Sequence, residues 1–238
     1  MLYLMSQPSP SLSIGERINE IKQTLPAGVR LVAVSKFHPS EAIVEAYESG
    51  QRLFGESRVQ ELSTKHAELG EMYLDLIWHF IGPLQTNKVK YIAPFIGMIE
   101  SVTSEKLLLE INKQALKNHR TIDVLLEVHI AREESKSGFS PEEVFELLQK
   151  VKANPEAYSG ICICGLMAMA TNTDDEAQIA LEFDTIARLH ADIKQSGLLL
   201  APEDFTELSI GMSSDYHIAL KHGATLVRVG SAIFGERD

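Results

Sequence analysis

A lysine stands at the end of a short apolar run, in 31-LVAVSKFHP-39. Such a run, rich in valine and too short for a helix, is typical of a buried strand. The Lys36 amine at its mouth either reaches out to water or takes part in chemistry. Burial and nearby cations lower the pKa of a lysine, and the neutral amine attacks an aldehyde to form a Schiff base. Which role applies depends on what the other elements place beside Lys36.

Two later apolar runs end in small residues and hydroxyls, in 211-GMSSD-215 and 230-GSAIFG-235. Both segments lead into a predicted helix, and helix starts with free N–H groups and small hydroxyl residues bind anions. For either segment alone, a serine that caps a helix is the simpler interpretation. Both segments together favour a phosphate site that contains Met212, Ser213, Ser214, Gly230 and Ser231.

An arginine lies inside the apolar run 226-LVRVG-230. An unpaired buried charge is very costly, so Arg228 must either point at a ligand or pair with a carboxylate such as Glu127. The sequence alone does not decide between these two alternatives.

Short apolar runs alternate with segments of helical periodicity along the chain. The runs are 31–35, 52–55, 77–82, 96–102, 122–130, 160–168, 207–211 and 225–230. The clearest helical segments are 104–118, 140–154 and 174–195, with Ser104, Ser140 and Asp174 as caps and Gly197 as a terminator. This alternation predicts parallel strands with right-handed crossovers, and eight units favour a (β/α)8 TIM barrel.

The barrel is expected to occupy residues 12–238 as a single domain, with an extra helix over 12–24 and a flexible N-terminus over 1–11. An open doubly wound sheet is the alternative, although a glycine-rich turn would then be usual after the first strand. In a barrel the strand ends meet at one mouth, where Lys36, both serine loops and Arg228 would gather. A phosphorylated aldehyde such as pyridoxal 5′-phosphate would use all of these groups.

Composition narrows the possible partners. A net charge of −11 argues against nucleic acid as the main partner. The N-terminal run 1-MLYLM-5 is too short for a signal peptide, and no segment reaches the ~18 apolar residues of a membrane span. We therefore expect a cytoplasmic protein that binds no membrane.

The two cysteines, Cys162 and Cys164, lie two residues apart in 160-GICICGLM-167 and should face the same side of a strand. A metal would need two further ligands, and the spacing of the sequence indicates none. We expect two buried thiols in a reducing compartment and no metal.

Seven segments together resemble the pyridoxal phosphate homeostasis protein family, and they occur in the family's order over residues 12–236. They are 31-LVAVSK-36, 54-FGESRVQE-61, 78-WHFIGPLQTNK-88, 134-ESKSGF-139, 165-GLMAMA-170, 210-IGMSSD-215 and 223-GATLVRVGSAIFG-235. The resemblance implies a barrel like the N-terminal domain of bacterial alanine racemase. It also implies pyridoxal phosphate on Lys36, with its phosphate on Met212, Ser213, Ser214, Gly230 and Ser231 and with Arg228 at the ring nitrogen.

The same resemblance implies that the protein buffers and delivers pyridoxal phosphate and influences amino-acid and keto-acid balance. It is not expected to be a robust enzyme, and no catalytic residue is assigned. Racemases of this fold add a second domain that supplies another acid or base, and this chain ends soon after the last strand. Apoenzymes that need the cofactor would be its recipients, and a monomer is expected.

Two alternatives remain from the sequence, a slow racemase or lyase and a regulatory protein that contacts a partner through residues 132–139. Lys136 could accept the cofactor during transfer or simply be solvated, and His79 could touch the cofactor or be a core histidine. Ser57 stands where many members of the family have asparagine, which removes any contact from that amide.

Overall fold

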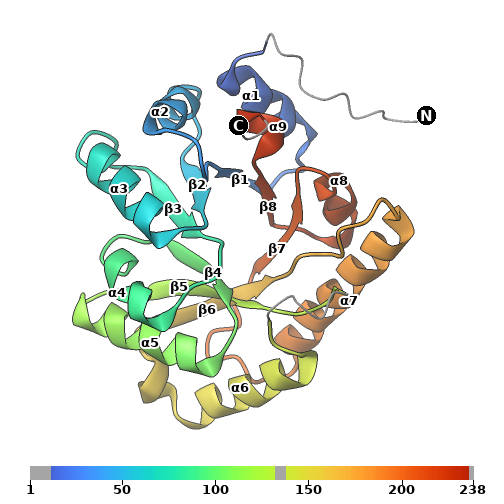
Figure 1. Ribbon diagram of the computed structural model, residues 1–238. Helices are drawn as coiled ribbons and strands as arrows, with labels where there is room; N and C mark the ends of the chain where they lie inside the picture. The colour runs from blue at the N-terminus through green and yellow to red at the C-terminus, as the bar shows by residue number, and fades with distance from the viewer. Residues whose placement is uncertain (1–11, 132–137, 236–238) are drawn as a thin grey trace.

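The computed structural model describes residues 12–131 and 138–235, and these form a closed barrel of parallel strands with helices around its outside (Figure 1). Each strand pairs with the next in the chain, and β8 closes the ring by pairing with β1. The strands are β1 (Arg30–Val34), β2 (Leu53–Glu56), β3 (Ile77–Phe80), β4 (Met98–Val102), β5 (Ile122–Glu127), β6 (Ile161–Met167), β7 (Glu207–Met212) and β8 (Leu226–Val229). The predicted TIM barrel is confirmed, and the open sheet is excluded.

Helices lie in the connections between strands, before β1 and after β8. They are α1 (Ile14–Thr24), α2 (Ser40–Glu48), α3 (Val59–Leu69), α4 (Val89–Ile92), α5 (Glu105–Lys117), α6 (Pro141–Ala153), α7 (Glu176–Gln195), α8 (Tyr216–Ala219) and α9 (Ser231–Phe234). Single 3-10 turns are η1 (Thr86–Lys88), η2 (Pro155–Tyr158) and η3 (Leu220–His222). In the described part of the chain, no helix is long and apolar enough to cross a membrane.

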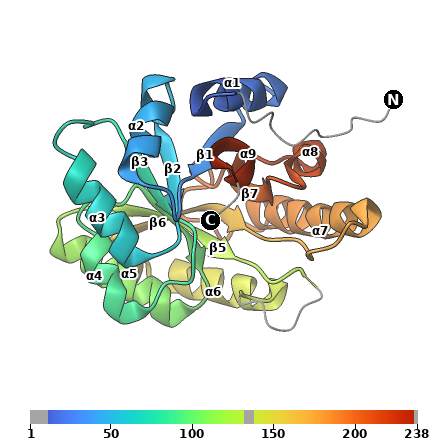
Figure 2. The ribbon, with the colours of Figure 1, turned by 45° about the horizontal axis from the view of Figure 1, so that its top comes forward.

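Helix α1 precedes the barrel in the chain and lies against its last helix, α9 (Figure 2). The Arg17 side chain donates a hydrogen bond from its terminal nitrogen to the Ile233 carbonyl at 3.0 Å. The start of the described chain is therefore fastened to the segment that follows β8.

The helix ends follow the sequence signals closely. Ser104 and Ser140 accept hydrogen bonds from backbone N–H groups three residues later, and Gly197 follows the C-cap of α7 with a φ of +70°. The predicted cap Asp174 is wrong by one residue. Asp175 caps α7, because its carboxylate accepts from the N–H groups of Ala177 and Gln178.

The barrel interior changes character along its axis. Its middle is an apolar layer of Val32, Leu53, Met98, Leu125, Cys164, Met167 and Leu226. Polar side chains lie on either side of this layer, because alternate residues of each strand point inward over the strand's whole length. The two mouths can therefore carry different chemistry.

Candidate functional site

The turns after β7 and β8 lie side by side at the C-terminal mouth of the barrel. The Gly230 N–H donates to the Ser213 hydroxyl oxygen at 3.1 Å, which joins the two turns. The Met212 N–H donates to the buried Asp215 carboxylate at 2.5 Å. These contacts fix both predicted serine segments in one place.

Several amides of these turns have no acceptor within the described residues. They belong to Ser213, Ser214 and Ser231. A backbone N–H without a protein partner is a strong donor that seeks one from solvent or from a ligand. Ser214 and Ser231 are exposed, so an anion can reach this end of the barrel from solvent.

Two glycines make room at this mouth. Gly211 has a φ of +90°, and a Cβ there would lie 2.7 Å from the Ala219 Cβ. A Cβ on Gly230 would lie 3.2 Å from the Val34 carbonyl oxygen and 3.3 Å from the Val34 Cβ. Glycine at 211 and 230 therefore lets the turns approach the mouth closely, which is what binding a phosphate by backbone amides requires.

Lys36 follows β1 directly beside these turns. Val34, which packs against Gly230, lies two residues before Lys36 in the chain. Phe37 has a φ of +68°, a left-handed conformation that costs a non-glycine residue energy. The His38 ring stacks on the Phe234 ring of α9, with centroids 5.1 Å apart. The lysine loop is therefore braced by the segment that follows β8.

A buried charge cluster holds the lysine loop from the other side. The Lys65 ammonium donates to the Ser35 carbonyl at 2.8 Å and to the Glu56 and Glu61 carboxylates, each at 2.7 Å. The Ser35 hydroxyl also donates to Glu56, at 2.7 Å. Glu61 in turn accepts the Phe37 N–H at 2.5 Å, so the strained residue after Lys36 is tied to the cluster. Burial raises the pKa of Glu56, although the Lys65 ammonium opposes this.

Arg228 projects into the barrel from β8, and its partners are all close. Its guanidinium donates to the Ser209 carbonyl at 2.8 Å, to the Ser209 hydroxyl at 2.6 Å and to the Ala168 carbonyl at 3.0 Å. The Glu100 carboxylate lies 3.8 Å away. Of the two alternatives at Arg228, a carboxylate pair is present, but the named partner Glu127 is wrong: the ion pair is with Glu100.

Glu100 joins the arginine to a histidine. The His79 Nδ1–H donates to one Glu100 oxygen at 2.6 Å, and the Ser209 hydroxyl donates to the other at 2.5 Å. Burial would raise the pKa of Glu100, but the contacts with His79, Arg228 and Ser209 hold it below its usual value. His79 is 3% exposed and its Nδ1 is paired with Glu100, which favours the core-histidine alternative over a contact with the cofactor.

Glu127 ends β5 with a side chain that is 5% exposed. Burial raises the pKa of this carboxyl to about 7, although the Arg228 charge acts in the opposite direction. A carboxyl group in this state exchanges its proton near neutral pH, unlike the ionised Glu100 on the neighbouring strand.

The mouth suits a phosphorylated aldehyde. Amides, hydroxyls and two glycines converge after β7 and β8, a lysine follows β1, and a fixed cation lies deeper in the barrel on β8. The lysine is held by its neighbours on both sides. These residues can bind a phosphate, hold an aldehyde carbon and present a permanent positive charge.

The structure brings the predicted serine turns together and places Lys36 beside them. Arg228 is the penultimate residue of β8 and lies opposite Val32, four residues before Lys36, in the pairing of β1 with β8. Lys136 and most of the predicted partner surface 132–139 lie outside the described residues.

Ser57 is half-buried and packs against Gly82. A side chain on residue 82 would collide with the Ser57 backbone.

Sequence reasoning missed the charged residues that support the site. Glu56, Glu61 and Lys65 lie in or just after the segment 54-FGESRVQE-61, and the spacing of Glu61 and Lys65 is the i,i+4 spacing of a helical ion pair. Glu100 lies in the apolar run 96–102, where a carboxylate needs a partner just as Arg228 does. Pairing the two buried charges with each other would have found this network.

Comparison with protein families matches residues 12–238 to "Alanine racemase, N-terminal domain". Among curated proteins, the chain is 40% identical over 215 residues to the pyridoxal phosphate homeostasis protein of Vibrio alginolyticus, covering 90% of this chain and 88% of that one. It is 38% identical over 210 residues to the protein of the same name from Haemophilus influenzae, covering 88% and 86%.

Solved structures agree with these matches. PipY of Synechococcus elongatus without pyridoxal phosphate has a TM-score of 0.86 at 37% identity, with 94% of this chain and 100% of that chain covered. The same protein with pyridoxal phosphate bound has a TM-score of 0.82 at 36% identity and the same coverage. An alanine racemase of Clostridium difficile shares the fold, with a TM-score of 0.72 at 17% identity, and the match covers 94% of this chain and 56% of that one.

Proposed function

The chain belongs to the family of pyridoxal phosphate homeostasis proteins, and on this premise we propose that it binds pyridoxal 5′-phosphate at the C-terminal mouth of its barrel and releases it to other proteins. The observation that carries the proposal is the pair of turns joined by Ser213 and Gly230, with unpaired amides, beside a lysine held at the end of β1. PipY, a relative of similar length, has been solved with this cofactor bound.

Each group has a distinct task. Lys36 would hold the aldehyde carbon, and Met212, Ser213, Ser214, Gly230 and Ser231 would bind the phosphate through amides and hydroxyls. The charge cluster of Lys65, Glu56 and Glu61 would keep the lysine loop in place. When bound, the cofactor supplies an electron-withdrawing ring and a reactive aldehyde.

Arg228 explains why robust catalysis is not expected. Strong electron withdrawal depends on a protonated ring nitrogen, which an acidic partner favours. Arg228 is fixed by Ser209, Ala168 and Glu100, and arginine stays protonated. Facing the ring nitrogen, it would oppose protonation there. A cofactor site with this arginine suits storage and delivery better than turnover, and no contact among the described residues specifically favours the racemase or lyase alternative.

We also propose a cellular role for this binding. A carrier of this kind would act in the cytoplasm as a monomer, limit the concentration of free aldehyde, and pass the cofactor to apoenzymes that need it. The curated relatives are named for homeostasis and not for a reaction.

The test combines binding, delivery and turnover. Apoprotein titrated with pyridoxal phosphate should show a shifted cofactor absorbance that saturates at one equivalent per chain. The loaded protein should then restore activity to a cofactor-free aminotransferase, and Lys36→Ala should do neither. Lys113→Ala is the matched control, because this lysine lies on α5 and its side chain is 73% exposed.

Turnover separates a carrier from an enzyme. Each amino acid is incubated with the loaded protein, and enantiomer exchange and keto-acid release are measured. Rapid turnover that depends on Lys36 would overturn the carrier proposal and leave the cofactor site intact.

A further inference from the structure

The N-terminal mouth of the barrel gathers sulfur and carboxylate groups that the proposed function does not use. Asp123 is the second residue of β5, Cys162 is the second residue of β6, and the two are paired in register. Cys164 follows two residues later on the same strand. One ligand atom from each of these three side chains lies within 4.8 Å of the other two.

A bulge in β6 contributes to this geometry. The pairing of β5 with β6 shifts between Val124 and Leu125, so that Cys164 is an extra residue between the partners Ile163 and Gly165. A bulge redirects side chains locally. The Cys164 sulfur lies 3.5 Å from the Cys162 sulfur, and its S–H donates to it. Both cysteines are free thiols.

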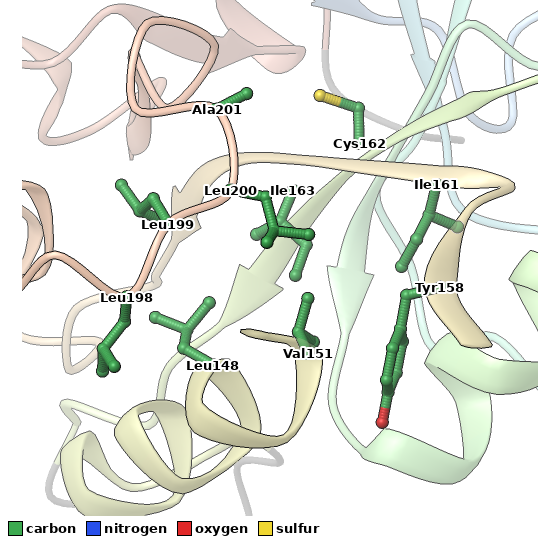
Figure 3. A pocket seen from close by; sticks show the side chains of 10 residues that line it. All are labelled: Leu148, Val151, Tyr158, Ile161, Cys162, Ile163, Leu198, Leu199, Leu200 and Ala201. Carbon is green, nitrogen blue, oxygen red and sulfur yellow. The ribbon is translucent and has the colours of Figure 1, made fainter. Parts of the chain in front are cut away.

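A second carboxylate approaches from the loop before β7. The Asp204 Oδ2 lies 3.9 Å from the Cys162 sulfur. Figure 3 shows the Cys162 sulfur directed toward the loop that carries Ala201, three residues before Asp204. The group of three ligand atoms and Asp204, which contacts Cys162, therefore come from three separate segments of the chain.

The carboxylates of this cluster, Asp123 and Asp204, are exposed to solvent. In the residues that the structure describes, neither Asp123 nor Asp204 forms an ion pair with a lysine, arginine or histidine. Both carboxylates are therefore available to a cation that arrives from solvent.

The surroundings are apolar on two sides. Cys164 is 7% exposed and packs into the apolar layer of the barrel with Leu125 and Leu226. Beside Cys162 lies a small cavity of about 100 Å³, which Leu198, Leu199 and Leu200 help to line. Apolar side chains thus border the thiols, while the carboxylates of Asp123 and Asp204 are exposed.

We propose that Cys162, Cys164 and Asp123 bind one Zn²⁺ ion at the N-terminal mouth of the barrel, with Asp204 as the fourth ligand. In a tetrahedral zinc site with bonds of about 2.3 Å, two sulfurs are about 3.8 Å apart, close to the separation seen here. Thiolates select zinc over magnesium or calcium, which prefer oxygen ligands. The site is at the opposite end of the strands from Lys36 and does not depend on the proposed cofactor function.

Binding must release protons, because zinc takes thiolates as ligands. The S–H proton of each cysteine passes to the buffer as its Zn–S bond forms, and no oxidation occurs. Zinc affinity is therefore expected to fall as the pH falls, and zinc addition should acidify a weakly buffered solution.

Cobalt(II) is the probe, because it occupies zinc sites and its thiolate bonds absorb light. Full-length protein, reduced and freed of metal, is titrated with Co²⁺ and then with Zn²⁺. We expect a thiolate-to-cobalt band that saturates at one equivalent and disappears when one equivalent of Zn²⁺ is added. Absence of the band in the wild-type protein would overturn the proposal.

Variants assign the ligands. The double substitution Cys162→Ser and Cys164→Ser should abolish the band, and Asp123→Asn should weaken binding by at least about tenfold. Glu203→Gln is the matched control, because it removes an exposed acid next to Asp204 and should change nothing. Equal weakening by Glu203→Gln and Asp123→Asn would show general attraction of cations by surface acids and contradict a defined site.

A measurement on the wild-type protein needs no substitution. Alkylation of the two cysteines by iodoacetamide is monitored by mass spectrometry. Zn²⁺ should slow this alkylation, and Mg²⁺ at the same concentration should leave its rate unchanged. Unchanged alkylation of Cys162 at saturating Zn²⁺ would exclude it as a ligand.

Discussion

The two mouths of the barrel are formed by the same strands but offer opposite chemistry. The C-terminal mouth presents Lys36, the glycine turns and amides that have no acceptor among the described residues, which suit an anion. The N-terminal mouth presents two thiols and two carboxylates, which suit a cation. An apolar layer separates them. If both proposals hold, one closed barrel carries an anion site and a cation site, with a packed apolar interior that we expect to keep them independent.

Strand β5 displays this contrast in a few residues. Asp123, Leu125 and Glu127 are two residues apart and therefore share the inward side of the barrel. Asp123 reaches the thiol cluster, Leu125 is fully buried in the apolar layer, and Glu127 lies within the field of Arg228. One strand thus contributes a side chain to each end and one to the partition between them.

Substitution of Lys36 should have the largest effect on the C-terminal mouth. Lys36→Ala removes the amine that would hold the aldehyde and leaves phosphate contacts alone, so binding of pyridoxal phosphate should weaken on the order of 100-fold, about 2.7 kcal/mol. Equilibrium dialysis measures this directly. Retention of wild-type affinity would place the cofactor elsewhere.

Breaking the buried network should cost more stability than breaking a surface pair. Arg228→Met leaves Glu100 buried without its cation, and the loss of a partner from such a pair costs about 3–5 kcal/mol. The control Lys150→Met breaks a pair with Glu105 in which both side chains are partly exposed, so it should cost at most about 1 kcal/mol. Urea unfolding of the apoproteins compares the two. Equal costs would contradict a tightly coupled interior.

Glu127 should give the apoprotein a characteristic pH dependence. Its pKa rises from an ordinary 4.5 to about 7 on folding, so the folded state binds the proton more tightly. Its contribution to stability is therefore full below about pH 4.5 and is lost as the pH rises to about 7, by at most about 3 kcal/mol.

Glu127→Gln removes this dependence, because an amide does not titrate. Urea unfolding at pH 5 and pH 8 should show a larger loss in the wild-type protein than in Glu127→Gln. Identical losses would mean that Glu127 is ionised throughout this range.

The contact between the two turns should have a modest effect. Ser213→Ala removes the acceptor of the Gly230 N–H and a hydroxyl that would bind the phosphate, which together should cost about 1 kcal/mol, or about fivefold in cofactor affinity. Titration by absorbance resolves this difference. No change would show that the backbone amides alone position the phosphate.

The smallest effect is expected from changes at the other end. Replacing both cysteines by serine should alter cofactor affinity by less than about twofold, since distant and independent sites are additive within about 0.5 kcal/mol. A larger change in the same titration would show that the two mouths communicate through the apolar layer.

Local patterns in the sequence predict most of the fold. All eight strands lie within or beside the predicted apolar runs, and helix caps such as Ser104 and Ser140 act as expected. These features depend on neighbouring residues, so the sequence carries them directly. The serine turns of the site were found in the same way, because barrel geometry dictates where strand ends meet.

Contacts between residues far apart in the chain were not predictable in the same way. Arg228 meets Glu100 and not Glu127 because the register of the closed barrel decides which inward side chains face each other. Asp204 and Asp123 approach the cysteines from two other segments, and neither shows a ligand spacing in the sequence. Such partners depend on the tertiary structure.

Reduction of the loaded protein with borohydride tests the central claim most directly. Borohydride fixes the cofactor to the amine that holds it, and digestion followed by mass spectrometry identifies the residue. We predict a pyridoxyl group on Lys36, absent from Lys36→Ala and retained in Lys113→Ala. A pyridoxyl group on another lysine, or none after reconstitution with excess pyridoxal phosphate, would contradict the assignment of the C-terminal mouth as the cofactor site.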